Sequence, residues 1–226
     1  MTNSVNLIMD GREISARQGL TILEAAQEVG IEIPTLCYHK DLNPFGACNL
    51  CSVEIQQNGS SRIVASCAYP VEPGLRVKTR SPKIDKIRRM LIEVVAPRVS
   101  QGGTLRGRLR RLADEYGANS SRFASKSTAE PLECILCGLC VRYCAEVKKM
   151  NAIGFVGRGI DRQVVLYPAK AQQCYQCKAC YKVCPTGKIA VSMPKVAGDF
   201  PSEFCVDAYL STHGTKLHKL SSLEQI

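Results

Sequence analysis

Short runs of alternating apolar and polar residues recur within positions 1 to about 80, a pattern typical of β-strands with one buried face. Two pairs of runs are each joined by a dipeptide that readily takes positive φ angles, Asp10-Gly11 in the first pair and Asn58-Gly59 in the second. The paired runs are NLIMD with REISA and CSVEIQQ with SRIVASC, and LRVKT follows them. The pattern predicts two hairpins and a closing strand.

A short helix is expected between the two hairpins. Thr21 and Glu24 form a capping-box signature, and Gly30 can end the helix in the left-handed conformation. Hairpin, helix, hairpin and closing strand together predict a β-grasp domain over residues 1–80.

Helical periodicity replaces the strand pattern after residue 80. Ser81 can cap a helix that begins at Pro82. The apolar face expected for this helix consists of Ile84, Ile87, Leu91 and Val94 or Val95. The apolar face of a second expected helix consists of Leu105, Leu109, Leu112 and Tyr116. Residues 81–128 are therefore predicted to form a basic helical linker.

Most of the net charge of +10 lies in this linker, because Pro82 to Lys126 holds eleven Lys or Arg and four Asp or Glu. The stretch Arg106–Arg111 is consistent with a solvated helix face, a subunit-docking surface or a nucleic-acid contact. Trp is absent and aromatic residues make up 6%, so the stacking platform of single-stranded nucleic-acid binders is lacking. We expect no nucleic-acid partner.

Thirteen cysteines are the most unusual feature of the composition. The N-terminus has no secretory pattern, and no window approaches the length of an apolar membrane span, so we expect a soluble, cytoplasmic protein. Disulfides are rare in that compartment, and an odd count fits a disulfide framework poorly. Metal binding is the favoured explanation.

Eight of the cysteines form an internal repeat, CILCGLCVRYC and CYQCKACYKVCP. Both copies follow the C-x2-C-x2-C-x3-C spacing of two-cluster bacterial ferredoxins, in which the last Cys of each run ligates the other cluster. Only the second copy has the usual Pro, and Ala145 stands in its place in the first. The predicted ligands are Cys134, Cys137, Cys140 and Cys184 for one [4Fe–4S] cluster, and Cys174, Cys177, Cys180 and Cys144 for the second. Residues 129–195 are the expected ferredoxin-like domain, and 196–226 form a polar tail.

Four cysteines nearer the N-terminus follow C-x10-C-x2-C-x15-C, which suits the two pairs of thiolates that a [2Fe–2S] cluster needs. They are Cys37, Cys48, Cys51 and Cys67. Small residues before the close pair, Gly46 and Ala47, allow backbone amides to approach the sulfides.

Zinc is the alternative for each cysteine group, although two triple spacings exceed what one tetrahedral site requires. A thioredoxin-like redox pair is disfavoured because neither run sits alone between a strand and a helix.

Four further cysteine and histidine residues are given no metal-binding role. Cys205 is interpreted as a buried or idle thiol, and His39 as an exposed loop residue. His213 and His218 lie in the polar tail without a metal partner at suitable spacing.

Three stretches of the chain resemble a known group of proteins: IPTLCYHKDLNPFGACNLCSVEI, SPKIDKIRRMLIEVVAPRV and FVGRGIDRQVV. They look like the small, diaphorase-side iron–sulfur subunit of NAD-reducing [NiFe] hydrogenases. They are also similar to the N-terminal parts of the large iron–sulfur subunit of respiratory complex I and of [FeFe] hydrogenases. The resemblance covers roughly residues 3–192 and implies an α+β protein with a β-grasp [2Fe–2S] ferredoxin domain, a helical linker and a two-cluster [4Fe–4S] ferredoxin-like domain.

One departure from these relatives concerns a further cluster. They usually carry a [4Fe–4S] site ligated by one His and three Cys between the two ferredoxin parts, whereas this sequence has no His or Cys from Ala68 to Glu133. That site is therefore expected to be missing.

The resemblance implies a non-catalytic electron-transfer subunit. It would relay electrons between a flavin subunit that reacts with NAD(P)H and a second catalytic subunit, such as a hydrogenase, a formate dehydrogenase or another reductase. The complex implied is soluble and of a kind that includes electron-bifurcating enzymes. No G-x-G-x-x-G fingerprint follows a strand, so no nucleotide or flavin is expected on this chain. The alternative is a free-standing ferredoxin-like carrier or redox sensor.

Overall fold

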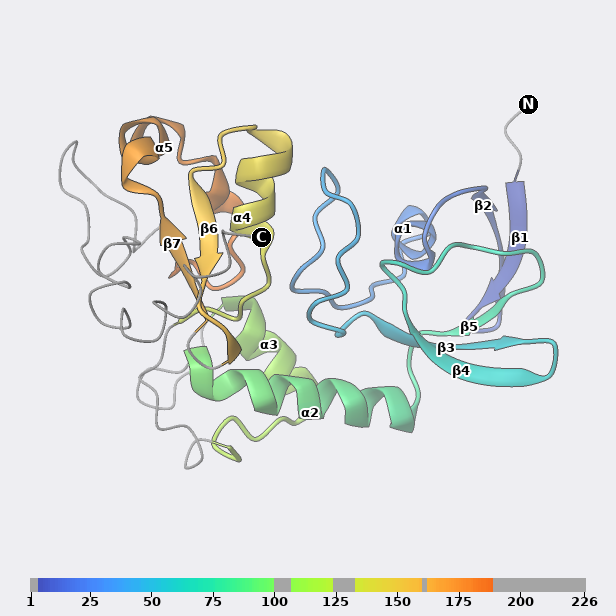
Figure 1. Ribbon diagram of the computed structural model, residues 1–226. Helices are drawn as coiled ribbons and strands as arrows, with labels where there is room; N and C mark the ends of the chain where they lie inside the picture. Colours follow the sequence, from blue (N-terminus) through green and yellow to red (C-terminus); the bar gives the residue numbers. More distant parts are fainter. Residues whose placement is uncertain (1–3, 100–106, 124–132, 160–161, 189–226) are drawn as a thin grey trace, which may run out of the picture. The chain divides into compact units, whose positions relative to one another are not determined.

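The chain forms two compact units, Met1–Cys137 and Gly138–Ile226, in a computed structural model that describes residues 4–99, 107–123, 133–159 and 162–188 (Figure 1). The predicted domain boundaries after residues 80, 128 and 195 stay predictions. The described residues do not include Leu105, Arg106, Lys126, Cys205, His213 or His218, nor the predicted tail 196–226.

The first unit begins with a five-stranded mixed sheet in the order β2-β1-β5-β3-β4 (Figure 1). The strands are β1 (Ser4–Met9), β2 (Arg12–Arg17), β3 (Ser52–Gln57), β4 (Ser60–Ala65) and β5 (Arg76–Lys78). Strand β5 runs parallel to β1 and antiparallel to β3, which joins the two hairpins into one sheet.

Both hairpin turns have the predicted backbone. The φ angles are 48° and 82° at Asp10 and Gly11, and 50° and 76° at Asn58 and Gly59. Positive φ at both central residues is what a tight type I′ turn requires, because its twist matches that of the flanking strands. The two predicted hairpins are confirmed.

Helix α1 (Ile22–Glu28) packs its apolar residues into the sheet. Its capping box is present: the Glu24 N–H donates to Thr21 Oγ1 at 3.3 Å, and the Thr21 N–H donates to Glu24 Oε2 at 2.8 Å. Gly30 follows with a φ of 73°. The hairpins, helix and closing strand confirm the predicted β-grasp arrangement and the α+β class.

Two helices complete the described part of the first unit, α2 (Pro82–Val99) and α3 (Gly107–Tyr116). The Ser81 hydroxyl accepts a hydrogen bond from the Ile84 N–H at 3.2 Å, as an N-terminal cap does. In α3 the predicted apolar residues Leu109, Leu112 and Tyr116 are buried, which confirms that face.

The face predicted for α2 is partly wrong. Ile84 is buried, and Leu91 and the alternative Val95 pack against the apolar core as predicted, whereas Val94 is 55% exposed. The other buried residues of α2 are Arg88, Ile92, Glu93 and Ala96. Periodicity of apolar residues cannot find this face, because two charged side chains lie on it and both have hydrogen-bond partners elsewhere in the unit.

A second apolar core joins α2 and α3 to the loops that carry the N-terminal cysteines. Leu36 and Leu50, each one residue ahead of a cysteine, are buried in it. Their partners in this core are Ile92, Ala96, Leu109, Leu112, Ala113 and Tyr116. The helix pair therefore covers the cysteine loops instead of merely leading away from them.

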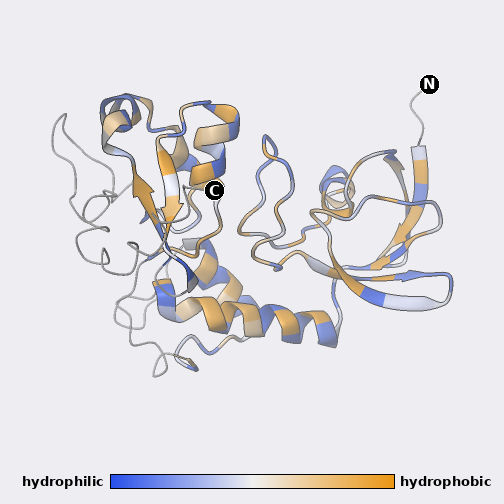
Figure 2. Cartoon of the chain, viewed as in Figure 1, coloured by the Kyte–Doolittle hydropathy of each residue, from blue (hydrophilic) through white to orange (hydrophobic). Residues whose placement is uncertain are grey.

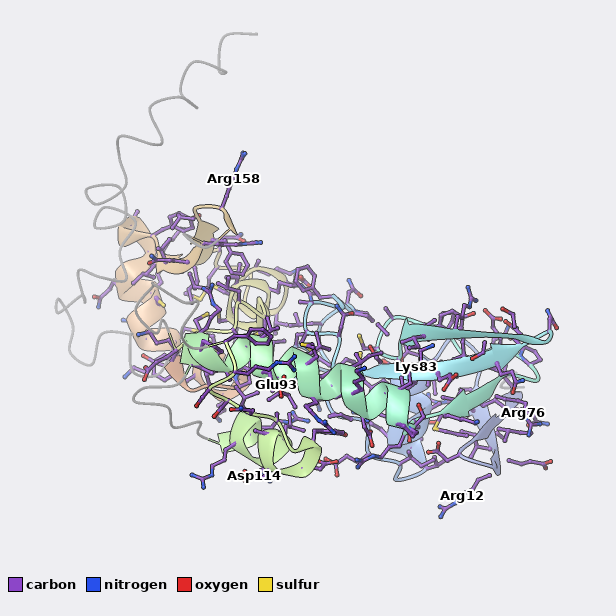
Figure 3. The ribbon with its side chains drawn as sticks, turned by 90° about the horizontal axis from the view of Figure 1, so that it is seen from below. Arg12, Arg76, Lys83, Glu93, Asp114 and Arg158 are labelled. Carbon is purple, nitrogen blue, oxygen red and sulfur yellow. The ribbon has the colours of Figure 1, made fainter. Side chains whose placement is uncertain are left out.

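Glu93 is a buried carboxylate of α2 (Figure 3), with 3% of its surface exposed. It accepts hydrogen bonds from the Asn119 N–H at 3.1 Å and from the Arg122 guanidinium at 2.7 Å. Burial by itself raises the pKa of Glu93, but these two donors outweigh burial and hold the pKa below its ordinary value.

Replacing Glu93 by Ala is expected to lower the free energy of unfolding by about 1–3 kcal/mol, because the Asn119 N–H loses its acceptor and the buried ion pair is broken. A depressed pKa contributes stability above the unfolded-state pKa, which is about 4.3 for Glu. The difference from wild type is therefore full at pH 7 and shrinks as pH falls through the folded-state pKa. Urea unfolding followed by circular dichroism measures it.

Asp114→Ala is the matched control, because Asp114 is an exposed carboxylate of α3 whose pair with Arg110, at 3.8 Å, is also exposed. Its stability should stay close to that of wild type at every pH. Equal losses in the two variants would contradict the role given to Glu93.

The second unit consists of short helices around a two-stranded antiparallel ribbon, which Figure 2 colours mostly as hydrophobic. Its elements are α4 (Leu139–Arg142), η2 (Tyr143–Val147), β6 (Ile153–Val156), β7 (Gln163–Leu166), η4 (Pro168–Lys170), α5 (Ala171–Cys177) and η5 (Ala179–Val183). Gly138 before α4 and Lys178 between α5 and η5 have positive φ angles, so each cysteine run changes direction sharply. In the described part of the chain, no helix has the length and apolarity to cross a membrane.

Candidate metal centres

The four N-terminal cysteines lie on loops of the first unit. Cys48 packs against the core of α2 and α3, whereas Cys51 and Cys67 belong to the core of the sheet and α1. Cys37, Cys51 and Cys67 are 4%, 1% and 1% exposed, and Cys48 is half-buried. Pairing of β3 with β4 brings Cys51 and Cys67 close together. The Ser66 N–H donates to the Cys51 carbonyl at 3.1 Å, and Cys67 is the residue after Ser66.

The sulfur atoms form two close pairs. Cys37 Sγ and Cys48 Sγ are 3.4 Å apart, and the Cys48 N–H donates to Cys37 Sγ at 3.3 Å. A hydrogen bond from the Cys37 thiol lowers the pKa of Cys48 to about 6, and one from the Cys67 thiol lowers the pKa of Cys51 to about 7. The same hydrogen bonds raise the pKa of the two donor thiols, Cys37 and Cys67. Two pairs of adjacent thiols are the donor set that two irons need.

Ser66 is a site residue that the cysteine spacing did not single out. It is 0% exposed, and its hydroxyl has no hydrogen-bond partner. This hydroxyl is close enough to the Cys51 thiol to lower its pKa slightly, although it does not reach hydrogen-bonding geometry. A buried O–H donor beside the Cys51 thiol fits a bound group that offers sulfur acceptors, because buried hydroxyls are rarely left unpaired.

In the second unit, one cavity is lined by four cysteines that come from both repeats. They are Cys144, Cys174, Cys177 and Cys180, the set predicted for the second [4Fe–4S] cluster. The remaining lining residues include Met150, Ala152 and Ile153. The Ala152 N–H donates to Cys144 Sγ at 3.3 Å, which gives that sulfur a backbone donor.

Two of the thiols that line this cavity are harder to deprotonate than free cysteine. Burial, followed by the neighbouring cysteines, raises the pKa of Cys174 to about 11 and that of Cys180 to about 12. Four thiolates cannot share an apolar cavity without cations between them. Iron would supply that positive charge and deprotonate the thiols, so the donor set fits an iron–sulfur cluster.

The remaining predicted set is divided between the units, because Cys134 and Cys137 end the first while Cys140 and Cys184 belong to the second. Cys134 Sγ accepts from the Leu136 N–H at 3.4 Å, and Cys184 Sγ lies 3.5 Å from Thr186 Oγ1. This ligand set stays a prediction.

Other candidate ligands in the described part of the chain add nothing to these sets. No three His, Cys, Asp or Glu side chains there, the predicted cysteine sets included, meet the geometry for binding one metal ion. An iron–sulfur cluster differs from such a site because its thiolates are divided among two or four irons. His39 is half-buried and not exposed as predicted, and its Nδ1 accepts from the Asp41 N–H at 3.3 Å.

Comparison with known families assigns both parts of the chain. Residues 2–82 match the 2Fe-2S iron-sulfur cluster binding domain, and residues 133–188 match the 4Fe-4S dicluster domain. One [2Fe–2S] and two [4Fe–4S] clusters are therefore the cofactors of this chain, as the cysteine spacing predicted.

A solved structure tests the predicted resemblance over most of the chain. A chain of the NAD+-reducing [NiFe]-hydrogenase, in its H2-reduced crystal structure, is 32% identical with a TM-score of 0.59. The match covers 73% of this chain and 75% of that one. This chain belongs to the family of iron–sulfur subunits of NAD-linked oxidoreductases. The predicted resemblance is thereby confirmed.

Curated members of this iron–sulfur subunit family are much longer. The NADPH-Fe(3+) oxidoreductase subunit alpha of Geobacter sulfurreducens is 34% identical over 84% of this chain. The NADH-ubiquinone oxidoreductase 75 kDa subunit of Reclinomonas americana is 33% identical over 82%. The chain spans 24% of the length of the first relative and 29% of the length of the second.

Proposed function

We propose that this chain is an electron-relay subunit that connects an NAD(P)H-reactive flavin subunit to a second catalytic redox subunit. The observation that carries the proposal is the joining of a 2Fe-2S domain and a 4Fe-4S dicluster domain in one chain that resembles a chain of the NAD+-reducing [NiFe]-hydrogenase over 73% of its length. The second subunit would be a hydrogenase, a formate dehydrogenase or another reductase. The bound clusters supply reversible one-electron chemistry.

The residues proposed to hold the clusters are those predicted from the spacing. Cys37, Cys48, Cys51 and Cys67 would hold the binuclear cluster, with one thiol pair for each iron. Cys174, Cys177, Cys180 and Cys144 would hold one tetranuclear cluster, supported by their shared cavity. Cys134, Cys137, Cys140 and Cys184 would hold the other, supported by the motif alone.

The surrounding residues would exclude water and position the ligands. Leu36 and Leu50 bury the N-terminal loops, and Met150, Ala152 and Ile153 line the cysteine cavity of the second unit. Limited solvent access and backbone donors to sulfur are the means by which a protein adjusts a cluster potential. A cytoplasmic site of action is part of the proposal, because thiols stay reduced there.

The test is anaerobic purification of the tagged chain from cells that also express its genomic neighbours, at physiological salt. We expect a flavoprotein to co-purify, and we expect NADH or NADPH to reduce the clusters of the complex within the mixing time. The chain separated from that flavoprotein should stay oxidised with the same nucleotide and become reduced with dithionite. Isolation of a fully loaded chain without any partner would instead favour the free-standing carrier.

A further inference from the structure

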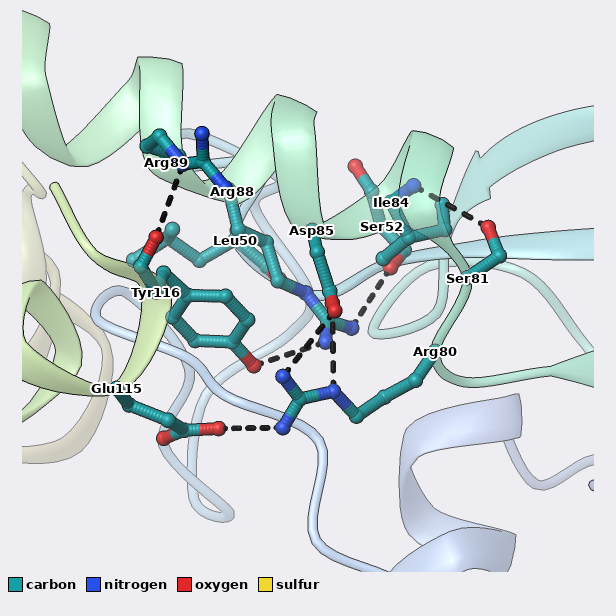
Figure 4. A network of polar contacts seen from close by, with 10 residues as sticks. All are labelled: Leu50, Ser52, Arg80, Ser81, Ile84, Asp85, Arg88, Arg89, Glu115 and Tyr116. Atoms are coloured by element: carbon teal, nitrogen blue, oxygen red, sulfur yellow. Dashed lines mark hydrogen bonds and ion pairs between the residues drawn. The ribbon is translucent and has the colours of Figure 1, made fainter.

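Arg88 is the largest fully buried side chain of the described residues, with 1% of its surface exposed. Figure 4 shows it within a network of polar contacts. It extends from α2 toward the cysteine loop. Nε donates to the Leu50 carbonyl at 3.0 Å, Nη2 to the Ser52 carbonyl at 2.9 Å, and Nη1 to the Tyr116 hydroxyl at 3.0 Å. All three nitrogens of the guanidinium thus have acceptors.

None of these acceptors is an anion. Among the described residues no carboxylate pairs with Arg88, whereas the nearby Arg80 pairs with Asp85 and Glu115. Burial raises the pKa of Tyr116, so its hydroxyl is a neutral phenol at neutral pH and brings no negative charge. Arg88 is therefore a buried cation held by neutral dipoles, which is an unfavourable arrangement unless an anion lies nearby.

The two carbonyls that Arg88 binds belong to the residues on either side of Cys51. Both hydrogen bonds therefore hold the guanidinium against the backbone that flanks a proposed cluster ligand. A binuclear cluster with four thiolates is a net anion, and its negative charge increases by one on reduction. A cation at this place stabilises the reduced form more than the oxidised form.

We propose that Arg88 is the counter-charge of the [2Fe–2S] cluster, a positioning residue that raises the reduction potential of that cluster and fixes the Cys51 loop. The inference rests on the proposed Cys51 ligand and on no particular partner or substrate. Through Tyr116 the same guanidinium contacts α3, so the helix pair and the cluster loop share one polar link.

The experiment separates charge from geometry with two variants of the full chain, Arg88→Gln and Arg88→Lys, each isolated anaerobically. EPR-monitored redox titration measures the midpoint potential of the binuclear signal, and the tetranuclear signals serve as internal references. In Arg88→Gln the reduction equilibrium should fall about tenfold or more, which is about 59 mV for a one-electron couple. In Arg88→Lys it should stay within about threefold of wild type.

Arg89→Gln is the matched control, because Arg89 is the less buried neighbour on α2 and donates to the Tyr116 carbonyl at 3.0 Å. It removes the same charge from a more solvated position, so the binuclear potential should change less than about threefold.

Equal potentials in Arg88→Gln and Arg88→Lys overturn the proposal. If Arg88→Gln does not assemble the binuclear cluster, Arg88→Met is the second neutral variant. If neither neutral variant assembles the cluster but Arg88→Lys does, the result supports a required cation. If Arg88→Lys also fails to assemble the cluster, the proposal is overturned, because the planar hydrogen-bonding geometry of the guanidinium and not its charge would then be what the cluster needs. Because every readout uses the isolated chain, these outcomes do not depend on whether a flavin partner is found.

Discussion

Cys51→Ala should abolish the binuclear EPR signal and leave both tetranuclear signals in place. Cys51 is 1% exposed, and its thiol forms one of the two sulfur pairs of the first unit, so the variant loses a buried thiolate that bulk solvent does not readily reach. A [2Fe–2S] cluster that loses one of four thiolates loses its closed ligand set. Iron per chain should fall from about ten to about eight.

Cys205→Ala provides the control for this loss, because Cys205 belongs to none of the cysteine motifs. Its iron content and spectra should match those of wild type. An unchanged binuclear signal in Cys51→Ala would falsify the N-terminal ligand set, and a loss of tetranuclear signals in the same variant would show that the units do not assemble independently.

The second large effect concerns ligation across the two repeats. Cys144 ends the first run yet lines the cavity of Cys174, Cys177 and Cys180. Cys144→Ala should therefore remove the cluster of the second run, and Cys184→Ala should remove that of the first. Each variant should retain about six irons and lose the magnetic interaction between tetranuclear centres.

Comparison of spectra identifies which cluster each variant has lost. The tetranuclear signal that survives in Cys144→Ala should match that of Cys174→Ala, and the signal in Cys184→Ala should match that of Cys137→Ala. If Cys144→Ala instead resembled Cys137→Ala, each run would supply all four ligands of its own cluster, and the crossed assignment would be wrong.

Local chemistry explains why much of the architecture could be predicted. Asp10-Gly11 and Asn58-Gly59 determine their turns through backbone preferences that need no distant partner, and the Thr21–Glu24 box closes within one helical turn. The two ferredoxin runs are also informative, because the spacing of the cysteines along the chain determines whether they can reach the irons of a [4Fe–4S] cluster.

Two charged residues on the buried face of α2, Arg88 and Glu93, could not be predicted, because their hydrogen-bond partners lie far away in the sequence. The acceptors of Arg88 on the cysteine loop are carbonyls 36 and 38 residues earlier, and the donors to Glu93 lie 26 and 29 residues later. A hydrophobicity pattern places both side chains in solvent. The Ser66 hydroxyl could not be found from spacing either, although its place next to Cys67 was a usable signal.

The contacts between α2 and the Leu50–Ser52 segment bear on where this protein can be cut. A fragment that ended at Arg80 would keep all five strands, yet it would uncover Leu36 and Leu50 and deprive two carbonyls of their guanidinium. The smallest transplantable [2Fe–2S] module is therefore one that retains α2 and α3. Engineers who wish to fuse this redox module to another enzyme should place the junction after residue 123, beyond the contact between Arg122 and Glu93.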